Sequence, residues 1–260
     1  KPDISINGDA SNVLSELIPL VKKLNTKDWL KKIELWKKKH PLKYPKRGGL
    51  RAQHILAELD TLTKSNAIIS TDVGQHQMWA AQFCKSIRGN QWLSSGGAGT
   101  MGYGFPAAIG AQLGMPKETV IAVVGDGGFQ MTMSELATAA IHKLPIKILI
   151  INNRYLGMVR QWQELFFENR ESGVDMEGNP DFVKIGDAYG IKGFHLRRSG
   201  DVTKVLKKAL EYNEGPCIIE AEVVKADNVF PMIPAGAAVS EMLIDEPPKT
   251  KKLQKPVGST

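Results

Sequence analysis

The sequence predicts an α/β fold of the doubly wound type, with a mainly parallel sheet and helices on both faces. The first observation is the stretch 119–157, in which two short runs rich in β-branched residues, 120–124 and 146–151, flank a segment of helical period. That pattern is typical of a βαβ unit with parallel strands. The second observation is that similar alternation of strand and helix continues along most of the chain, which implies a sheet covered on both faces.

The elements follow in a regular order from residue 48. A helical period covers 51–62, and the polar segment 168–180, with Gly and Pro, predicts a loop. The expected strands are 67–70, 92–94, 120–124, 146–151, 193–196 and 217–224. Three further helices are expected to begin after residue 76, at Pro106 and near Thr132. Three more are expected over 156–167, 182–189 and 202–212.

Three regions are expected. Residues 1–47 contain a possible short strand at 3–10 and two amphipathic helices, the first capped by Ser11 or Asn12 and the second by Asn25 or Thr26. Residues 48–244 form the main domain. Residues 245–260 hold four Lys and three Pro and are expected to be a flexible tail.

Charge and composition exclude several classes of function. The net charge of +7 lies entirely in residues 1–47, with 12 Lys and Arg against five Asp and Glu, so residues 48–260 carry 22 of each sign. A nucleic-acid-binding face is therefore not expected on the main domain. No apolar run suits a membrane span or a signal peptide. Cys84 and Cys217 are expected to be reduced, which suits a cytosolic protein.

The strand ends of the central unit carry the chemistry. Asp126 follows the first run and Asn153 follows the second. Parallel strands place both at the same edge of the sheet, where open α/β sheets bind ligands. Carboxylate and amide oxygens suit Mg²⁺, which takes further ligands from phosphates. The sequence therefore predicts a magnesium and diphosphate site here.

Two neighbouring features support an anion at the same edge. Gly127 and Gly128 lack Cβ atoms and permit a close approach of the backbone to a phosphate. Thr132 and Glu135 have the spacing of a capping box, so a helix is expected to begin near Thr132 and to direct its N-terminus at the anion.

Other nucleotide sites fit less well. Gly97, Gly99 and Gly102 match the GxGxxG pattern of dinucleotide sites. Such a site also needs an acidic residue at the end of a strand about 20 residues further on. At that distance this sequence has KET, which precedes a strand instead of following one. The sequence contains no GxxxxGK[ST] phosphate-binding loop.

Four motifs carry a resemblance to a known family. They are VGQHQMWAAQF at 73–83, SSGGAGTMGYGFPAAIGA at 94–111, GDG at 125–127 with 24 residues before Asn152 and Asn153, and NNRYLGMVRQWQELF at 152–166. In this order and spacing they resemble the catalytic subunit of acetohydroxyacid synthase (acetolactate synthase), over about residues 48–244. The family has the thiamine-diphosphate-binding fold.

The resemblance implies a set of ligand contacts. It assigns Mg²⁺ to Asp126, Asn153 and the backbone carbonyl of Tyr155, and places Met101 beneath the bend of thiamine diphosphate. The remaining cofactor-binding residues that it implies are Gly74, Gln75, His76, Gly99, Gly125, Gly127, Gly128, Leu156, Gly157, Met158 and Val159. It also assigns Met158, Trp162 and Ala235 to a substrate channel, although several relatives carry Ser at the position of Ala235.

The resemblance also implies a reaction and partners. Pyruvate is decarboxylated and joined to pyruvate or 2-ketobutyrate, in branched-chain amino-acid biosynthesis. The activating Glu comes from another domain of a neighbouring subunit, so the site is expected at the interface of a homodimer or larger oligomer. Residues 1–47 resemble the end of an FAD-associated middle domain. A regulatory subunit is a possible partner, and nucleic acid and membrane are not expected.

Alternatives remain at this stage. The location is cytoplasmic, or organellar if the source is a plant or fungus. A pyruvate oxidase or 2-keto acid decarboxylase shares the cofactor, and a non-catalytic cofactor-binding fragment is a third possibility. The chain alone is expected to be inactive.

Overall fold

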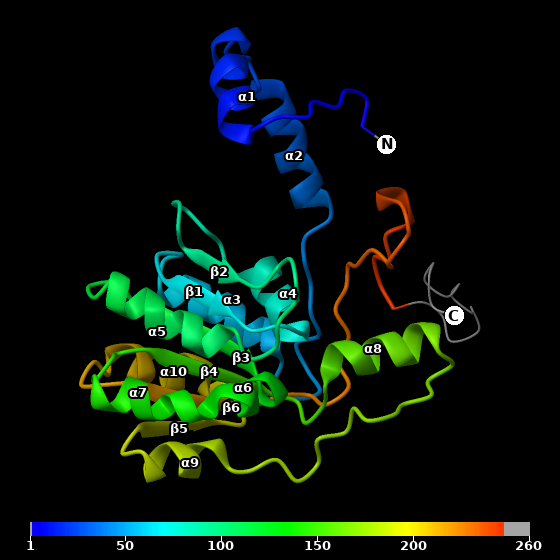
Figure 1. Cartoon of the computed structure of the whole chain (residues 1–260). Helices are drawn as coiled ribbons and strands as arrows, with labels where there is room; N and C mark the ends of the chain where they lie inside the picture. The colour runs from blue at the N-terminus through cyan, green and yellow to red at the C-terminus, as the bar shows by residue number, and fades with distance from the viewer. Residues whose placement is uncertain (1, 247–260) are drawn as a thin grey trace. The chain divides into compact units, whose positions relative to one another are not determined.

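The computed structural model describes residues 2–246 (Figure 1). It separates into two compact units, Lys1–Lys43 and Tyr44–Thr260. Of the expected tail 245–260, residues 247–260 lie outside the described residues. No helix among residues 2–246 combines the length and the hydropathy needed to cross a membrane.

The first unit consists of two helices. Helix α1 (Ala10–Leu17) ends in the 3₁₀ turn η1 (Ile18–Leu20), and α2 spans Lys27–Lys39. Helix α1 begins earlier than predicted, because Asp9 and not Ser11 or Asn12 provides the cap, accepting a hydrogen bond from the Asn12 amide at 3.1 Å. The expected strand at 3–10 does not form, since no neighbouring strand in this unit offers it backbone partners.

None of the described residues of this unit is buried. Trp29 and Trp36 pack edge to face, with ring centroids 5.6 Å apart, and the Lys32 ammonium lies over both rings. The two Trp side chains therefore pack on each other. The assignment of residues 1–47 to a middle domain stays a prediction.

The second unit is built on a six-stranded sheet in the order β2-β1-β3-β4-β6-β5 (Figure 1). Every pairing between these strands is parallel, which confirms the predicted fold class. The strands are β1 (Ile68–Thr71), β2 (Trp92–Ser94), β3 (Val120–Gly125), β4 (Lys147–Asn152), β5 (Lys192–Leu196) and β6 (Cys217–Glu222).

Helices cover both faces of this sheet. The main helices are α3 (Ala52–Leu62), α4 (Gln75–Phe83), α5 (Gly104–Gly114), α6 (Asp126–Thr132), α7 (Leu136–Ile141), α8 (Gly157–Phe166), α9 (Phe182–Ala188) and α10 (Val202–Glu211). Short 3₁₀ turns are η2 (Met133–Glu135), η3 (Ser199–Asp201) and η4 (Val239–Glu241). Most bounds lie within one or two residues of those predicted.

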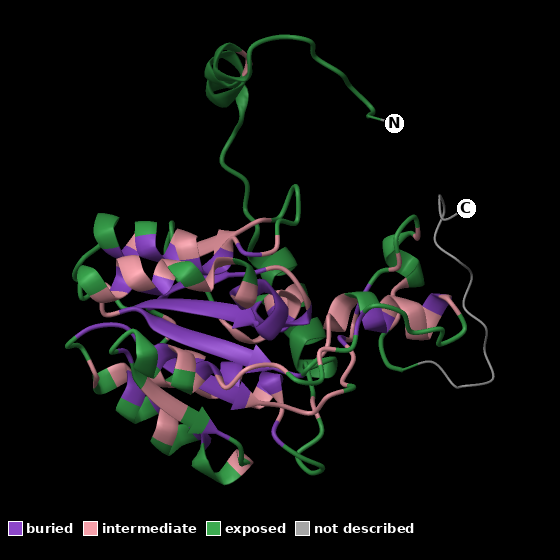
Figure 2. Ribbon diagram, turned by 60° about the horizontal axis from the view of Figure 1, so that its bottom comes forward, coloured by how far each residue is buried: buried purple, intermediate pink, exposed green. Residues whose placement is uncertain are grey.

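The central strands are buried on both faces, which explains their continuous apolar runs. Odd-numbered residues of β3, such as Ile121 and Val123, belong to the core cluster to which α3, α4 and α10 also contribute. Even-numbered residues, such as Ala122 and Val124, pack on α5, α6, α7 and α9. Figure 2 shows the buried strands between two layers of partly exposed helices.

The predicted helix start near Thr132 is wrong. Helix α6 begins at Asp126, directly after β3, and reaches Thr132 before a 3₁₀ turn leads into α7. The Thr132 hydroxyl donates to the Gly102 carbonyl at 3.2 Å, and Glu135 accepts from Thr138 instead of completing a capping box. A long-range hydrogen bond thus replaces the local one that the spacing suggested.

The segment after β6 returns across α8. The amide of Gln161 donates to the Val229 carbonyl at 3.1 Å and accepts from the Val229 N–H at 2.8 Å. Met232 pairs with Leu243 as an isolated bridge. The arm that follows β6 is therefore attached to α8 by buried polar contacts.

We expect Phe129→Ala to lower the free energy of unfolding by about 3–5 kcal/mol, because it removes a fully buried ring and leaves a cavity. Phe129 packs between Phe105 and Phe182, with ring centroids 5.8 and 5.6 Å away. Urea unfolding measures the change. Met131→Ala, at an exposed position of the same helix, is the control and should change stability by less than about 0.5 kcal/mol. Similar losses in both variants would contradict this assignment of the core.

Candidate cofactor and metal site

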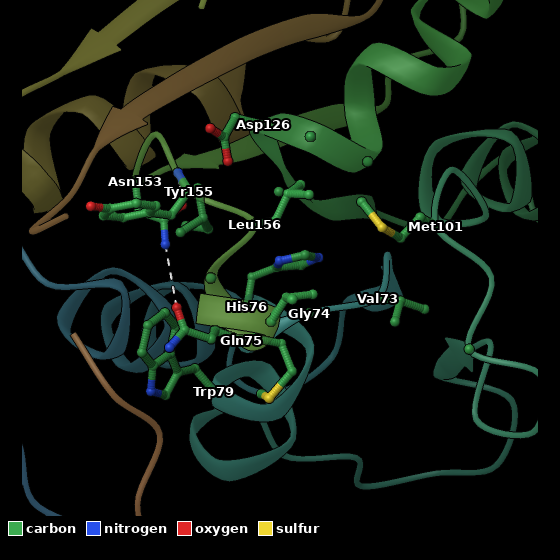
Figure 3. A pocket seen from close by; sticks show the side chains of 18 residues that line it. Val73, Gly74, Gln75, His76, Trp79, Met101, Asp126, Asn153, Tyr155 and Leu156 are labelled. Carbon is green, nitrogen blue, oxygen red and sulfur yellow. Dashed lines mark hydrogen bonds between the residues drawn. The ribbon is translucent and has the colours of Figure 1, made fainter. Parts of the chain in front are cut away.

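A cavity of about 270 Å³ opens at the carboxyl edge of the sheet, beyond β1, β3 and β4 (Figure 3). In the view of Figure 3, Asp126 and Asn153 lie on one side of it and Met101 on the other. The lining residues are Val73, Gly74, Gln75, His76, Trp79, Gly99, Met101, Gly125, Asp126, Gly127, Gly128, Ile151, Asn153, Tyr155, Leu156, Gly157, Met158 and Val159.

Every residue expected to contact the cofactor or the metal lines this one cavity. The structure therefore brings together segments that lie far apart in the sequence. The cavity adds three residues that sequence reasoning missed: Val73, Trp79 and Ile151. The individual roles stay predictions. Trp162 and Ala235 are not among the described lining residues, although Met158 is.

Asp126 is almost completely buried at the junction of β3 and α6. Its carboxylate accepts a hydrogen bond from the Asn179 amide at 2.6 Å and others from backbone N–H groups. Burial nevertheless raises the pKa of Asp126 to about 6, because the charged form loses its hydration. A cation at this position would stabilise the ionised form.

Asn153 is held at both ends of its amide. Its Oδ1 accepts from the Tyr155 N–H at 3.1 Å, and its Nδ2 donates to Gln75 Oε1 at 3.3 Å (Figure 3). Arg154, between Asn153 and Tyr155, has a positive φ of 56°, so the chain turns sharply after β4. This turn presents Asn153 and Tyr155 to the cavity.

Two glycines of the site, Gly127 and Gly157, lie close to neighbouring side chains. A Cβ on Gly127 would lie 2.7 Å from Leu156 Cδ2, and a Cβ on Gly157 would lie 2.1 Å from Gln75 Oε1. Any side chain at Gly157 would separate Gln75 from Asn153. These contacts are with protein side chains, so the expected close approach of the backbone to a ligand stays a prediction.

Asp72 fixes the glycine-rich loop against the end of β1. Its buried carboxylate accepts from the N–H groups of Val73 at 2.6 Å and of Gly102 at 3.0 Å, and more weakly from Gly104 at 3.4 Å. A Cβ on Gly128 would lie 2.7 Å from the same carboxylate. Sequence reasoning had placed Asp72 only in a loop, and its position directly after an apolar run was the available signal.

His76 lies in the cavity wall with 7% of its surface exposed, and its Nε2 has no hydrogen-bond partner in the structure. Burial lowers the pKa of His76 to about 4, against the smaller effect of a hydrogen bond with the Asp72 backbone. A buried polar atom without a partner is costly and points to a ligand in the cavity.

The donor set fits a metal-bound diphosphate. Among the described residues, no Lys or Arg lines the cavity, so no lining side chain carries a permanent positive charge. One carboxylate, one amide oxygen and a backbone carbonyl are available on one side, which matches the oxygen preference of Mg²⁺. The cation would supply the charge that a diphosphate needs.

Two of the three predicted channel residues, Trp162 and Ala235, do not line the cavity. Trp162 is half-buried on α8 and packs on Phe166, with ring centroids 5.2 Å apart. Ala235 is exposed in a turn of the arm that follows β6. Their assignment to a substrate channel stays a prediction.

A second group of ionisable side chains lies at the ends of β5 and β6. His195 lies between Asp181, at 4.0 Å, and Glu220, at 3.6 Å. The adjoining cavity of about 150 Å³ is also lined by Arg154 and Arg197, whose positive charges would oppose a cation. We interpret this group as a network of ion pairs.

The pKa of His76 makes stability depend on pH. Its folded value of about 4 lies below the ordinary 6.5, so between these values the unfolded chain binds more protons. The contribution of neutral His76 is complete above pH 6.5 and is lost as the pH falls to 4, by up to about 3 kcal/mol. Denaturant unfolding of the unliganded chain at pH 7 and 4.5 measures this loss. The free energy of unfolding should differ less between the two pH values for His76→Gln than for the native sequence. Equal differences would contradict the burial of an uncharged imidazole.

Comparison with known proteins identifies the family. Residues 72–221 match the family described as thiamine pyrophosphate enzyme, C-terminal TPP binding domain; thiamine pyrophosphate is another name for thiamine diphosphate. This match covers more than half of the chain.

Acetolactate synthase large subunits are similar over almost the whole chain. That of Pyropia yezoensis is 43% identical over 250 residues, which are 93% of this chain and 42% of the relative. That of Lactococcus lactis subsp. lactis is 44% identical over 245 residues, which are 94% of this chain and 42% of the relative. The large subunit of isozyme 2 of Escherichia coli K12 is 39% identical over 242 residues, which are 92% of this chain and 43% of the relative.

The chain thus spans about two fifths of the length of the relatives that it matches. The resemblance inferred from the four motifs is confirmed. The match over residues 72–221 shows that the chain belongs to the thiamine pyrophosphate enzymes and carries their C-terminal TPP binding domain.

Proposed function

We propose that this chain provides the diphosphate- and magnesium-binding half of the active site of an acetolactate synthase. The reaction joins pyruvate to a second 2-keto acid and gives 2-acetolactate or, with 2-ketobutyrate, 2-aceto-2-hydroxybutyrate. The observation that carries the proposal is the single cavity at the carboxyl edge of the sheet, in which all expected cofactor contacts converge. The similarity to acetolactate synthase large subunits supports this choice among the enzymes that share the cofactor.

Each part of the cavity has a role in the proposal. Asp126, Asn153 and the Tyr155 carbonyl would hold Mg²⁺, and Gly127 would let the backbone approach the diphosphate. Met101, on the opposite side, supports the bent form of the cofactor. Thiamine diphosphate, when bound, supplies the stabilisation of negative charge on the reacting carbon.

The chain's remaining contribution is to orient the reactants and to exclude water. Leu156 and Met158, at the start of α8, line the cavity, and their apolar side chains would exclude competing protons. We keep Trp162 and Ala235 as candidates for the substrate channel. Neither residue lines the cavity of this chain, so a channel that includes them would extend beyond this cavity.

The proposal includes parts beyond the matched region. The activating Glu, the FAD contacts and the second half of the site would come from another domain and from a partner subunit in a homodimer or larger oligomer. Regulation by a further subunit fits the same scheme. We also propose a cytoplasmic or organellar location, which the two free cysteines, Cys84 and Cys217, support.

Asp126→Ala should abolish the Mg²⁺-dependent binding of thiamine diphosphate, because it removes the only carboxylate among the described lining residues. Isothermal titration with thiamine diphosphate, with and without Mg²⁺, measures the effect. Asp187→Ala, which removes an exposed acid from α9, is the matched control and should bind as the native chain does. Unchanged binding by Asp126→Ala would remove the metal assignment.

The chain alone should form no acetolactate from pyruvate. Addition of the remaining part of an acetolactate synthase large subunit, as a second chain or by fusion, should restore formation. Parallel assays for acetolactate, hydrogen peroxide and acetaldehyde separate the synthase from a pyruvate oxidase and a decarboxylase. Peroxide or acetaldehyde as the main product would refute the proposed reaction, and no product of any kind would favour a cofactor-binding role without catalysis.

A further inference from the structure

We propose that Asn179 is a positioning residue that orients the Asp126 carboxylate for the metal ion. The inference rests on the proposed function and deepens it, because it assigns a role to the segment that sequence analysis described only as a polar loop. Asn179 Nδ2 donates to Asp126 Oδ2 at 2.6 Å. No other side chain among the described residues is recorded as donating to this carboxylate.

The orientation of the Asn179 amide is itself determined. Gln130 Nε2 donates to Asn179 Oδ1 at 3.0 Å and also to the Asp126 carbonyl at 3.3 Å. With its oxygen engaged by Gln130, Asn179 must direct its NH₂ group at Asp126. The same NH₂ group lies 3.4 Å from Asn152 Oδ1, at the end of β4. One amide therefore connects the ends of β3 and β4.

The loop that carries Asn179 is fixed beside the cavity. Leu156 N–H donates to the Val174 carbonyl at 2.9 Å, and Met176 N–H donates to the Arg154 carbonyl at 3.0 Å. These bonds attach the loop to the segment that presents Asn153 and Tyr155. Asn179 is thus held by the backbone around the site.

A neutral donor is suited to this task. A Lys or Arg in place of Asn179 would neutralise Asp126 and compete with a metal ion. An amide instead fixes one carboxylate oxygen without neutralising the negative charge. Partners of this kind orient metal ligands, and their loss typically weakens metal binding about 10- to 100-fold.

The test measures metal binding and does not depend on turnover. Mn²⁺ replaces Mg²⁺ in the 260-residue chain at constant thiamine diphosphate, and electron paramagnetic resonance reports both free Mn²⁺ and the spectrum of the bound ion. Asn179→Leu keeps the size of the side chain and removes its donor. We expect the Kd for Mn²⁺ to rise about 10-fold, with a broader spectrum of the bound ion.

Gln163→Met is the matched control. Gln163 anchors the same loop through two hydrogen bonds of 3.1 Å with Ser172, neither of which involves Asp126. Its loss should leave the Kd unchanged. Equal weakening in Gln163→Met and Asn179→Leu would show that the loop needs only to be anchored and would overturn the inference.

The remaining outcomes separate the two proposals. If the native chain does not bind Mn²⁺ with thiamine diphosphate, the proposed function fails and the inference with it. If the native chain binds and Asn179→Leu binds equally well, only the inference fails. If Asn179→Leu does not fold, Gln130→Met decides: weakening by a few-fold supports the orientation of Asn179, and an unchanged Kd refutes it.

Discussion

The site depends on the hydrogen bonds that the buried carboxylate of Asp72 accepts. This carboxylate lies at the end of β1 and gathers the N–H groups of Val73, Gly102 and Gly104. Burial raises the pKa of Asp72, and these backbone hydrogen bonds act in the opposite direction. Because Gly128 approaches the same carboxylate, three segments meet at one charge. Together with the hydrogen bond from Thr132 to the Gly102 carbonyl, it holds the loop that carries Met101 beside α6.

Much of the site could be predicted from the sequence, because one topological rule carries the argument. Parallel strands end at a common edge, so Asp126 and Asn153 had to lie near each other once 120–124 and 146–151 were interpreted as neighbouring strands. Buried strands also have continuous apolar runs, so the strand positions were recognisable. The glycine-rich loop was found through the family resemblance, since its pattern alone also fits a dinucleotide site.

The rest could not be predicted, because it depends on contacts between distant segments. Thr132 had the local signal of a helix cap, yet its hydroxyl bonds to Gly102, 30 residues away. Asn179 lay in a polar loop with no periodicity, and only the folded chain places its amide beside Asp126. The positions of Trp162 and Ala235 relative to the cavity depend on how α8 and the arm that follows β6 are placed. No local sequence pattern encodes that placement.

The composition of the cavity wall has a consequence for how its ligands enter. A diphosphate would find no permanently positive side chain among the described residues there, and a dication would find a single acid. Each ligand supplies the charge that the other lacks, so their affinities would be thermodynamically linked, each raising the other's by the same factor. A chelator that removes the metal would then also weaken the binding of the organic cofactor.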